Sequence, residues 1–434
     1  LKSALLLGTF VKKLILTVID ERIEDNKDLF QYKRVENVGI LFQDLFRALY
    51  KRVLKGLQPT LTKYADIVSA LSRCSTITNS FRTCIQTSNW CLPGTKFSRT
   101  GVSQVLSRIS LLSYYSHLNR VNQSISRESR NLDVRQINSS SIMFLDPADT
   151  PEGQPTGLVL NMAMGTFISK GTPSYVLFNI LKSVDFCDSI SYQNDWSSIF
   201  KIYINQELYG FTKNYKKVLD LFYKLRQSTI LPSEVAIYYD IYDQEIHINS
   251  EPGRLLRPLL RVNNNTITID PTKSWQEHIL AGHIVFRGPG ELEQAVIAFY
   301  PHELKEGGYD YCEIHPSLIH GSVCSIIPFS NCMPAPRVLF VSSQIKQAFS
   351  GLYASSLKQR FDTTSYQLNY AQKPLVQTLY GDNITNTGNG LNCMLAVLSS
   401  EGWNQEDALV FCKESIERGL FSTTEYKSIH ISSS

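Results

Sequence analysis

Four polar side chains interrupt an apolar region near the C-terminal end of the sequence. Residues 402–410 read G-W-N-Q-E-D-A-L-V, so the amides of Asn404 and Gln405 precede the carboxylates of Glu406 and Asp407. Two strand-like apolar runs flank them, L-N-C-M-L-A-V-L before and A-L-V-F after. Two interpretations are open: a polar turn between buried strands, or a pair of carboxylates that face a positively charged group.

A second group of acids lies in the stretch F-L-D-P-A-D-T-P-E-G. Asp146, Asp149 and Glu152 could bind a cation, but the surrounding proline and glycine residues favour a structured turn. A metal hydrolase built on these acids, or on Glu406 and Asp407, would need a metal-binding histidine or a third nearby acid. The spacing of residues along the chain indicates none.

Positive charge gathers between residues 98 and 135. This segment has no lysine and two acids, Glu128 and Asp133, against six arginines at positions 99, 108, 120, 127, 130 and 135. The excess equals the formal net charge of +4 of the whole chain. Arginines close to Tyr114 and Tyr115 suit a sugar-phosphate backbone. The alternative is a solvated loop with scattered ion pairs.

Length and composition indicate several folded domains. The chain has 434 residues, of which 43% are hydrophobic. Its nine cysteines are odd in number and include no C-x-x-C pair, which argues against a zinc knuckle or a disulfide framework and favours reduced thiols. Lys12 and Lys13 divide the first apolar run, so we expect no membrane span. The absence of an initial Met suggests a fragment of a longer polypeptide.

Local patterns predict an α+β fold. Apolar spacings of three and four predict helices at 38–57, ending at Gly56, and at 65–73, 217–226 and 333–349, besides a partly buried helix at the N-terminus. Alternating patterns predict hairpins at 198–210 and 235–248. From residue 310 onward, β-rich runs are predicted, including a strand, turn and strand over 312–329.

The order of the motifs resembles a known family. They are E-D-N-K-D-L-F-Q-Y-K-R (24–34), T-S-N-W (87–90), R-T-G-V-S-Q-V-L-S-R (99–108), S-H-L-N-R (116–120), D-T-P-E-G-Q-P-T-G-L-V (149–159), G-R-L-L-R-P-L (253–259), C-E-I-H-P-S-L-I-H-G (312–321), S-I-I-P-F (325–329), P-R (336–337), Q-K-P-L (372–375) and G-W-N-Q-E-D-A (402–408). Together they resemble the second-largest, β-like subunit of multisubunit DNA-directed RNA polymerases. The resemblance is to part of that subunit, in its eukaryotic, archaeal and large-DNA-virus form.

The resemblance implies a division of the chain into five parts. Residues 1–88 would be a helical remnant of the lobe and protrusion, and 89–172 the fork region. Residues 173–260 and 261–330 would be two mixed external domains, and 331–434 the β-rich start of the barrel-like hybrid-binding region. One departure is that N-S-S-S-I-M-F stands before T-P-E-G, where the family usually has His-Trp-Gly.

The resemblance also implies chemistry. The subunit would shape the active centre for templated nucleotidyl transfer, which uses Mg²⁺ shared with the largest subunit. Glu406 and Asp407 would reach the second Mg²⁺, partly through water. Asp407 should dominate because neighbouring side chains on an extended segment point to opposite faces. Arg337 would bind the triphosphate of the incoming nucleotide through its planar fork.

Further residues would contact nucleic acid: Lys346, Gln347 and Lys373 near the RNA–DNA hybrid, and Arg120, Arg127, Arg130 and Arg135 in the fork. The implied partners are the largest and smaller polymerase subunits, the DNA template, the RNA transcript and nucleoside triphosphates. We expect no zinc in this fragment, and no activity of the chain alone because it lacks a D-F-D-G-D-like triad.

The alternative to an enzyme subunit is a non-catalytic nucleic-acid-binding scaffold derived from it. An intracellular location is expected for either, in the nucleus for a cellular polymerase, and in the cytoplasm or virion for a viral or plasmid-borne one.

Overall fold

The computed structural model describes residues 2–63, 68, 75–91, 98–183, 199–384 and 388–432. It separates into two compact units, one formed by residues 1–34 with 108–434 and the other by residues 35–107. Both units contain helices and strands, so the fold is a mixed α/β arrangement, as predicted. No helix among the described residues is both long and apolar enough to cross a membrane.

The unit of residues 35–107 is built on two helices, α2 (Val38–Lys63) and α4 (Thr76–Thr87), and a two-stranded sheet of β1 (Asn89–Cys91) and β2 (Ser98–Thr100). Its core contains Leu45, Leu49, Cys84 and Trp90. The predicted end of the first helix at Gly56 is wrong, since α2 continues through Pro59. A glycine inside a helix costs only about 1 kcal/mol, so it does not by itself end one. The helix predicted at 65–73 falls almost wholly outside the described residues.

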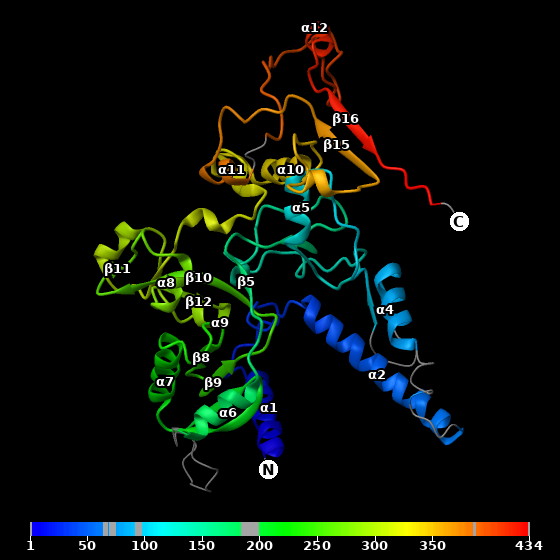
Figure 1. Ribbon diagram of the computed structural model, residues 1–434. Coiled ribbons are helices and arrows are strands. Elements are labelled where there is room, and N and C mark those ends of the chain that lie inside the picture. The colour runs from blue at the N-terminus through cyan, green and yellow to red at the C-terminus, as the bar shows by residue number, and fades with distance from the viewer. Residues whose placement is uncertain are drawn as a thin grey trace. The chain divides into compact units, whose positions relative to one another are not determined.

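A four-stranded sheet with the order β7-β6-β9-β8 forms from the two predicted hairpins. Its strands are β6 (Phe200–Ile204), β7 (Glu207–Thr212), β8 (Ala236–Asp240) and β9 (Glu245–Asn249). Side chains of α6 (Ser174–Ser183) and the predicted helix α7 (Tyr215–Gln227) pack on one face, against Ile202, Ile204 and Ile246. On the other face, Leu5 and Leu6 of α1 (Lys2–Val18) pack against Tyr203 and its neighbours (Figure 1).

The second large sheet forms around the long strand β10 (Leu255–Asn263). Its other strands are β5 (Phe167–Ile168), β11 (Thr266–Ile267), β12 (Ile284–Arg287), β13 (Ile297–Ala298) and β14 (Tyr311–Cys312). Two short helices, α8 (Trp275–Leu280) and α9 (Pro289–Leu292), and the 3₁₀ turn η3 (Pro301–Glu306) accompany it. Leu260, Ile284 and Cys312 are among its buried residues.

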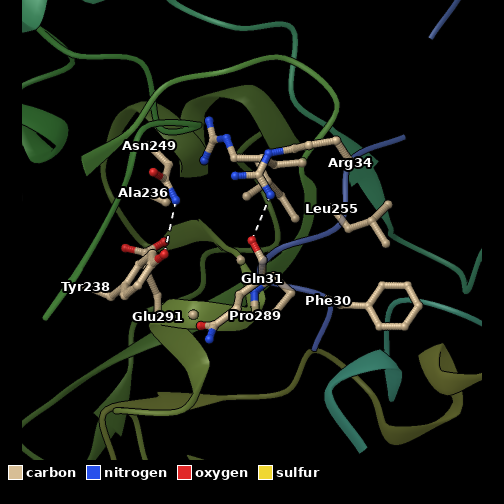
Figure 2. Close-up of a pocket in the computed structure, with 13 residues that line it drawn as sticks. Phe30, Gln31, Arg34, Ala236, Tyr238, Asn249, Leu255, Pro289 and Glu291 are labelled. Carbon is tan, nitrogen blue, oxygen red and sulfur yellow. Dashed lines mark hydrogen bonds between the residues drawn. The ribbon is translucent and has the colours of Figure 1, made fainter. Parts of the chain in front are cut away.

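A buried polar cluster lies beside α9, between elements of both large sheets. A cavity of about 20 Å³ lies there, lined by Gln31 and Arg34 of the N-terminal segment and by Arg254 and Glu291. Figure 2 shows side chains that surround it. Burial lowers the pKa of the Arg254 guanidinium to about 10. One nitrogen of Arg254 and one oxygen of Glu291 have no hydrogen-bond partner, so the cavity suits a bridging water rather than a substrate.

Residues 108–168 form a smaller region with α5 (Leu111–Leu118), the 3₁₀ turn η1 (Ser139–Ser141) and an antiparallel pair, β3 (Arg120–Asn122) and β4 (Val159–Asn161). The hydroxyl of Ser110 accepts a hydrogen bond from the backbone N–H of Ser113 and so caps α5. The chain between β3 and η1 contains no helix or strand, which confirms the predicted loop.

Beyond β14 the structure has fewer strands than predicted. The segment 312–329 contains β14 and the 3₁₀ turns η4 (Pro316–Ile319) and η5 (Cys324–Ile326) in place of strand, turn and strand. Pro316 and Pro328 lack the N–H that a sheet requires. The elements that follow are η6 (Ser330–Cys332), α10 (Ala335–Ile345), η7 (Leu357–Gln359), β15 (Thr364–Leu368), α11 (Leu379–Ile384), α12 (Lys413–Glu417) and β16 (Thr423–Lys427).

The apolar runs at 391–398 and 408–411 form no strand, contrary to the prediction. Among the described residues after 330, β15 and β16 pair with each other and are the only strands, so this region is not β-rich. Met394 and Val397 are fully or almost fully exposed. A strand needs a neighbour for its backbone groups, and no described segment pairs with these two runs.

Candidate nucleotide and nucleic-acid interface

The stretch around Glu406 and Asp407 consists of two consecutive tight turns. In the first, the N–H of Trp403 donates to the carbonyl of Ser400 (2.8 Å), and in the second the N–H of Ala408 donates to the carbonyl of Gln405 (3.1 Å). The two central residues of each turn have positive φ, with 53° at Glu406 and 66° at Asp407. Two successive positive φ values are typical of a type I′ turn.

The side chain of Asn404 ties the first turn to the segment that precedes it. Its side-chain oxygen accepts from the N–H of Ser400 (3.1 Å), and its side-chain nitrogen donates to the carbonyl of Leu398 (2.6 Å). The polar residues therefore shape a turn, as the first interpretation required, while the flanking runs are exposed. The extended backbone from which we inferred that Asp407 dominates is absent, so this geometric reason is wrong.

The carboxylates of Glu406 and Asp407 are exposed and unpaired. Neither has a hydrogen-bond or ion-pair partner among the described residues, including Arg337, Lys346 and Lys373. Two adjacent free carboxylates on a fixed turn could supply oxygen ligands to a hard divalent cation.

Arg337 lies in the first turn of α10, as predicted. The helix begins after Pro334, and the backbone N–H of Arg337 donates to the Pro334 carbonyl (2.9 Å). The guanidinium is exposed and stacks over the ring of Phe340, 5.5 Å from its centroid. No carboxylate of the described residues pairs with it. This leaves the planar fork available to an anionic ligand.

Lys346 and Gln347 lie at the C-terminal end of α10. The Lys346 Nζ donates to Asp149 Oδ1 at 2.8 Å, and both side chains are largely buried. Burial raises the pKa of the Asp149 carboxyl, and Lys346 opposes that rise. Lys346 therefore has an internal partner in this structure, whereas Gln347 is exposed. Sequence reasoning missed this pair because 197 residues separate its members.

Lys373 also has a partner, since its Nζ lies 3.0 Å from Asp382 Oδ1 in an exposed pair. Such pairs contribute about 0–1 kcal/mol and exchange readily with other ligands. Lys373 thus remains accessible to phosphate.

The four arginines at positions 120, 127, 130 and 135 differ in their surroundings. Arg127 and Arg130 are exposed on the loop after β3. Arg120 lies on β3 with its Nε buried and without a hydrogen bond, and together with burial it lowers the pKa of His117. Arg135 donates from its two terminal nitrogens to the carbonyls of Gln154, Thr156, Arg127 and Ser129 (2.6–2.9 Å).

Arg135 therefore connects two loops. One is the chain between β3 and η1, which we call the arginine-rich loop, and the other is the loop that carries T-P-E-G. The close approach explains Gly157, where a Cβ would collide with the backbone of Arg135 and where φ is +74°. We had predicted that Arg135 contacts nucleic acid, but its geometry favours a role in fixing this loop.

A histidine lies beside Asp146, although the spacing of residues in the sequence indicated none. Asp146, His320 and Cys324 each offer one ligand atom, and these atoms lie within 4.8 Å of one another. Asp149 and Glu152 do not belong to this group. The spacing of four residues from His320 to Cys324 was a readable signal, but their approach to Asp146 depends on the fold.

Comparison with known proteins places these features in a family. Residues 323–434 match the description "RNA polymerase Rpb2, domain 6", residues 104–168 match domain 3 and residues 202–263 match domain 4. These matches include the positions of Glu406, Asp407 and Arg337. They also include the arginine-rich loop.

Whole-chain relatives agree. DNA-directed RNA polymerase subunit Rpo2 of Sulfolobus acidocaldarius is 34% identical over 458 residues, with 98% of this chain and 40% of that protein covered. RNA polymerase II subunit RPB2 of Encephalitozoon cuniculi is 33% identical, with the same coverage. A probable RPB2 homolog of Invertebrate iridescent virus 6 is 32% identical, with 94% of this chain and 35% of that protein covered.

The chain belongs to the Rpb2 family, the second-largest subunits of multisubunit DNA-directed RNA polymerases. It spans about two fifths of the length of the relatives that it matches. The family that the motifs indicated is thereby confirmed.

Proposed function

We propose that this chain forms part of the active centre of a DNA-directed RNA polymerase and acts with the largest subunit in templated nucleotidyl transfer. One observation carries the proposal: the segment that matches Rpb2 domain 6 presents both an unpaired guanidinium and two unpaired carboxylates on fixed backbone. A phosphate and a cation are the complementary ligands of these groups. A metal-bound nucleoside triphosphate contains both.

Mg²⁺ fits the oxygen donors of the turn. Glu406 and Asp407 would hold it, in part through water, and the other ligands would come from the nucleotide and the partner subunit. When bound, the ion supplies charge stabilisation at the reacting phosphate. Because the turn fixes the backbone of both residues, the two carboxylates would need only side-chain rotation to reach that charge. Both acids project from adjacent positive-φ positions, so we propose that they act together.

Arg337 would bind the triphosphate directly. Its position in the first turn of α10 adds the positive end of the helix dipole to the guanidinium charge. Phe340 limits the orientations of the fork by stacking beneath it. These features favour bidentate phosphate recognition.

Arg127, Arg130, Lys373 and Gln347 would contact the nucleic-acid backbone, since all four are exposed. Lys346 and Arg120 would reach it only after some rearrangement, because one is paired and the other partly buried. The division of the chain into the five parts given above, from lobe and protrusion to hybrid-binding region, is also a proposal. It rests on the resemblance to the family.

The proposal predicts that the chain is inactive alone and active in the assembled polymerase. The measurement is incorporation of labelled nucleotide on a primed template scaffold, by the purified chain and by the polymerase that contains it. We expect incorporation only from the assembly, and its loss when Arg337, Glu406 and Asp407 are all replaced. Normal incorporation by the triple variant would instead favour a non-catalytic nucleic-acid-binding scaffold.

A further inference from the structure

Three side chains with different donor atoms meet beneath α10. Asp146 comes from the fork, while His320 and Cys324 come from the turn between η4 and η5. A carboxylate oxygen, an imidazole nitrogen and a sulfur all lie within 4.8 Å of one another. Ligands of one tetrahedral zinc ion are about 3.3–3.8 Å apart, because each lies about 2.0–2.3 Å from the metal. Asp146 Oδ1 and His320 Nδ1 already meet this separation at 3.4 Å, and the outer limit of 4.8 Å would have to close by side-chain adjustment when an ion binds.

The charge balance of the region favours a cation. The side chains of Asp146 and Asp149 are 0% and 1% exposed. Lys346 pairs with Asp149 at 2.8 Å and leaves Asp146 without a cationic partner of fixed charge. The carboxylate of Asp146 accepts hydrogen bonds from the N–H groups of Gly321 (2.6 Å) and Ala148 (2.8 Å), and His320 Nδ1 lies 3.4 Å from it. A buried carboxylate is costly unless its charge is compensated.

The backbone holds the three donors in place before any ion binds. The two N–H groups orient the Asp146 carboxylate, as outer-shell hydrogen bonds do in metal sites. The backbone carbonyl of His320 accepts a hydrogen bond from the N–H of Met164 (2.9 Å), which fixes the backbone next to the imidazole. Gly321 has no room for a Cβ, which would press on the Met162 carbonyl and on Asp146.

We propose that Asp146, His320 and Cys324 bind one divalent metal ion of the zinc class, with a water molecule as the fourth ligand. Mixed oxygen, nitrogen and sulfur ligands suit Zn²⁺ and, as a probe, Co²⁺. The thiol proton, which now faces the Ala148 carbonyl at 3.5 Å, would be released to solvent on binding. The carboxylate and the thiolate would then balance the two positive charges.

The ion would have a structural role. Cys324 packs with Ile327 and Val338, so the site lies against the inner face of α10, the helix that carries Arg337. Ser342 of α10 also donates to Ala148 (3.4 Å). An ion at this point would join the fork, the 320–324 turn and α10. This expectation replaces our prediction of no zinc in the fragment, and it does not depend on the proposed polymerase function.

The test is spectroscopic titration of the chain with Co²⁺, in a background where exposed Cys332, Cys393 and Cys412 are replaced by Ser. We expect one equivalent to bind with a thiolate-to-metal charge-transfer band that Zn²⁺ abolishes. Cys324→Ser should remove the band and weaken binding at least about tenfold. His320→Gln should weaken binding similarly.

Two matched controls address folding and specificity. Cys312→Ser alters another buried cysteine outside the site, and His315→Gln alters an exposed histidine nearby; both should keep the band. Zn²⁺ should also raise the thermal midpoint of the background protein and leave that of Cys324→Ser unchanged. Absence of stoichiometric binding, or a band that survives Cys324→Ser, would overturn the proposal.

Discussion

The arginines of this chain differ in what their guanidinium groups contact, and this difference separates structural from functional roles. Arg226 and Arg257 are buried in ion pairs with Glu291 and Glu313. Arg337 is exposed over an aromatic ring and has no carboxylate partner among the described residues. The proposed triphosphate contact rests on this unpaired guanidinium at a helix N-terminus.

Replacement of Arg337 by Ala should lower kcat/KM for nucleotide addition by the assembled polymerase. Loss of a charge-assisted contact of about 1.5–3 kcal/mol corresponds to roughly tenfold to a hundredfold. Arg337→Lys should recover little of this loss because a point charge cannot reproduce the fork. Single-nucleotide addition on a preformed scaffold measures both variants. Equal rates for wild type and Arg337→Ala would exclude the triphosphate contact.

At the residue scale, the sequence predicted what a residue could do better than what it contacts. The motif register identified Glu406, Asp407 and Arg337, and none of the three has an ion-pair partner among the described residues. The ion pair of Lys346 with Asp149 could not be predicted from the sequence, because it joins segments that are far apart in the chain. The same holds for the approach of His320 to Asp146, across 174 residues.

Helices and hairpins were more predictable than irregular segments because their signals are local. The periods of α7 and α10 and the Asn-Gln turn between β6 and β7 lie within a few residues of sequence. The segment 312–329 misled the prediction because its apolar residues resemble strands, while its prolines prevent pairing. The prediction of strands in the apolar runs on either side of Glu406 was wrong for another reason. A strand forms only when it pairs with another segment, and that segment is not local in the sequence.

The contacts of Arg135 predict that one residue controls the order of the arginine-rich loop. Arg135→Ala removes four hydrogen bonds from a charged group to carbonyls of Gln154, Thr156, Arg127 and Ser129. The loop should open more easily by about 1–3 kcal/mol. Trypsin cleavage after Arg127 and Arg130 should then become roughly fivefold to a hundredfold faster, with the global unfolding midpoint changed less.

Arg418→Ala, at an exposed arginine outside the loop, is the matched control and should leave this cleavage unchanged. Gly157→Ala should accelerate cleavage for the same reason as Arg135→Ala, because the added methyl group displaces the Arg135 backbone. Unaltered proteolysis in both loop variants would show that the loop is held by other contacts.

The carboxylate of Glu245, between α1 and the four-stranded sheet, predicts that the stability of the fold depends on pH. Burial acts to raise the pKa of Glu245, but hydrogen bonds from His247 and Lys13 outweigh it and hold the pKa below its ordinary value of 4.5. Lys201 adds a pair at 2.9 Å. A depressed carboxyl pKa stabilises the fold above pH 4.5, and this contribution is lost as the pH falls toward the folded-state pKa.

Glu245→Gln should therefore lower the free energy of unfolding by about 1.5–3 kcal/mol near neutral pH and by less at about pH 3. Urea unfolding at the two pH values measures the difference. Glu207→Gln, at an exposed acid on the neighbouring strand β7, should change little at either pH. An equal loss for Glu245→Gln at both pH values would contradict the assigned charge interaction.

At the scale of the whole molecule, the exposed apolar residues gather in the segment that follows α10. Met394, Val397 and Leu379 are more than nine-tenths exposed. Exposed apolar surfaces of this kind mark interaction sites. Under the proposed function, we expect other parts of the polymerase to cover these residues. The turn with Glu406 and Asp407 lies within this segment.

Magnesium dependence tests the central claim most directly. In the assembled polymerase, Asp407→Asn keeps the shape of the side chain and tolerates positive φ, but removes one charge from the turn. The variant should need more Mg²⁺ for its half-maximal rate of single-nucleotide addition, and high Mg²⁺ should restore part of its activity. Glu406→Gln should behave alike. Arg337→Ala should not respond to added Mg²⁺.

Glu401→Gln supplies the control, because Glu401 is an exposed acid with positive φ in the neighbouring turn. A Mg²⁺ titration of the four variants beside wild type is therefore the decisive measurement. A shifted curve for Asp407→Asn and Glu406→Gln, with wild-type curves for Glu401→Gln, is the predicted result. Superimposable curves for all of them would contradict the account and reduce G-W-N-Q-E-D to a structural turn.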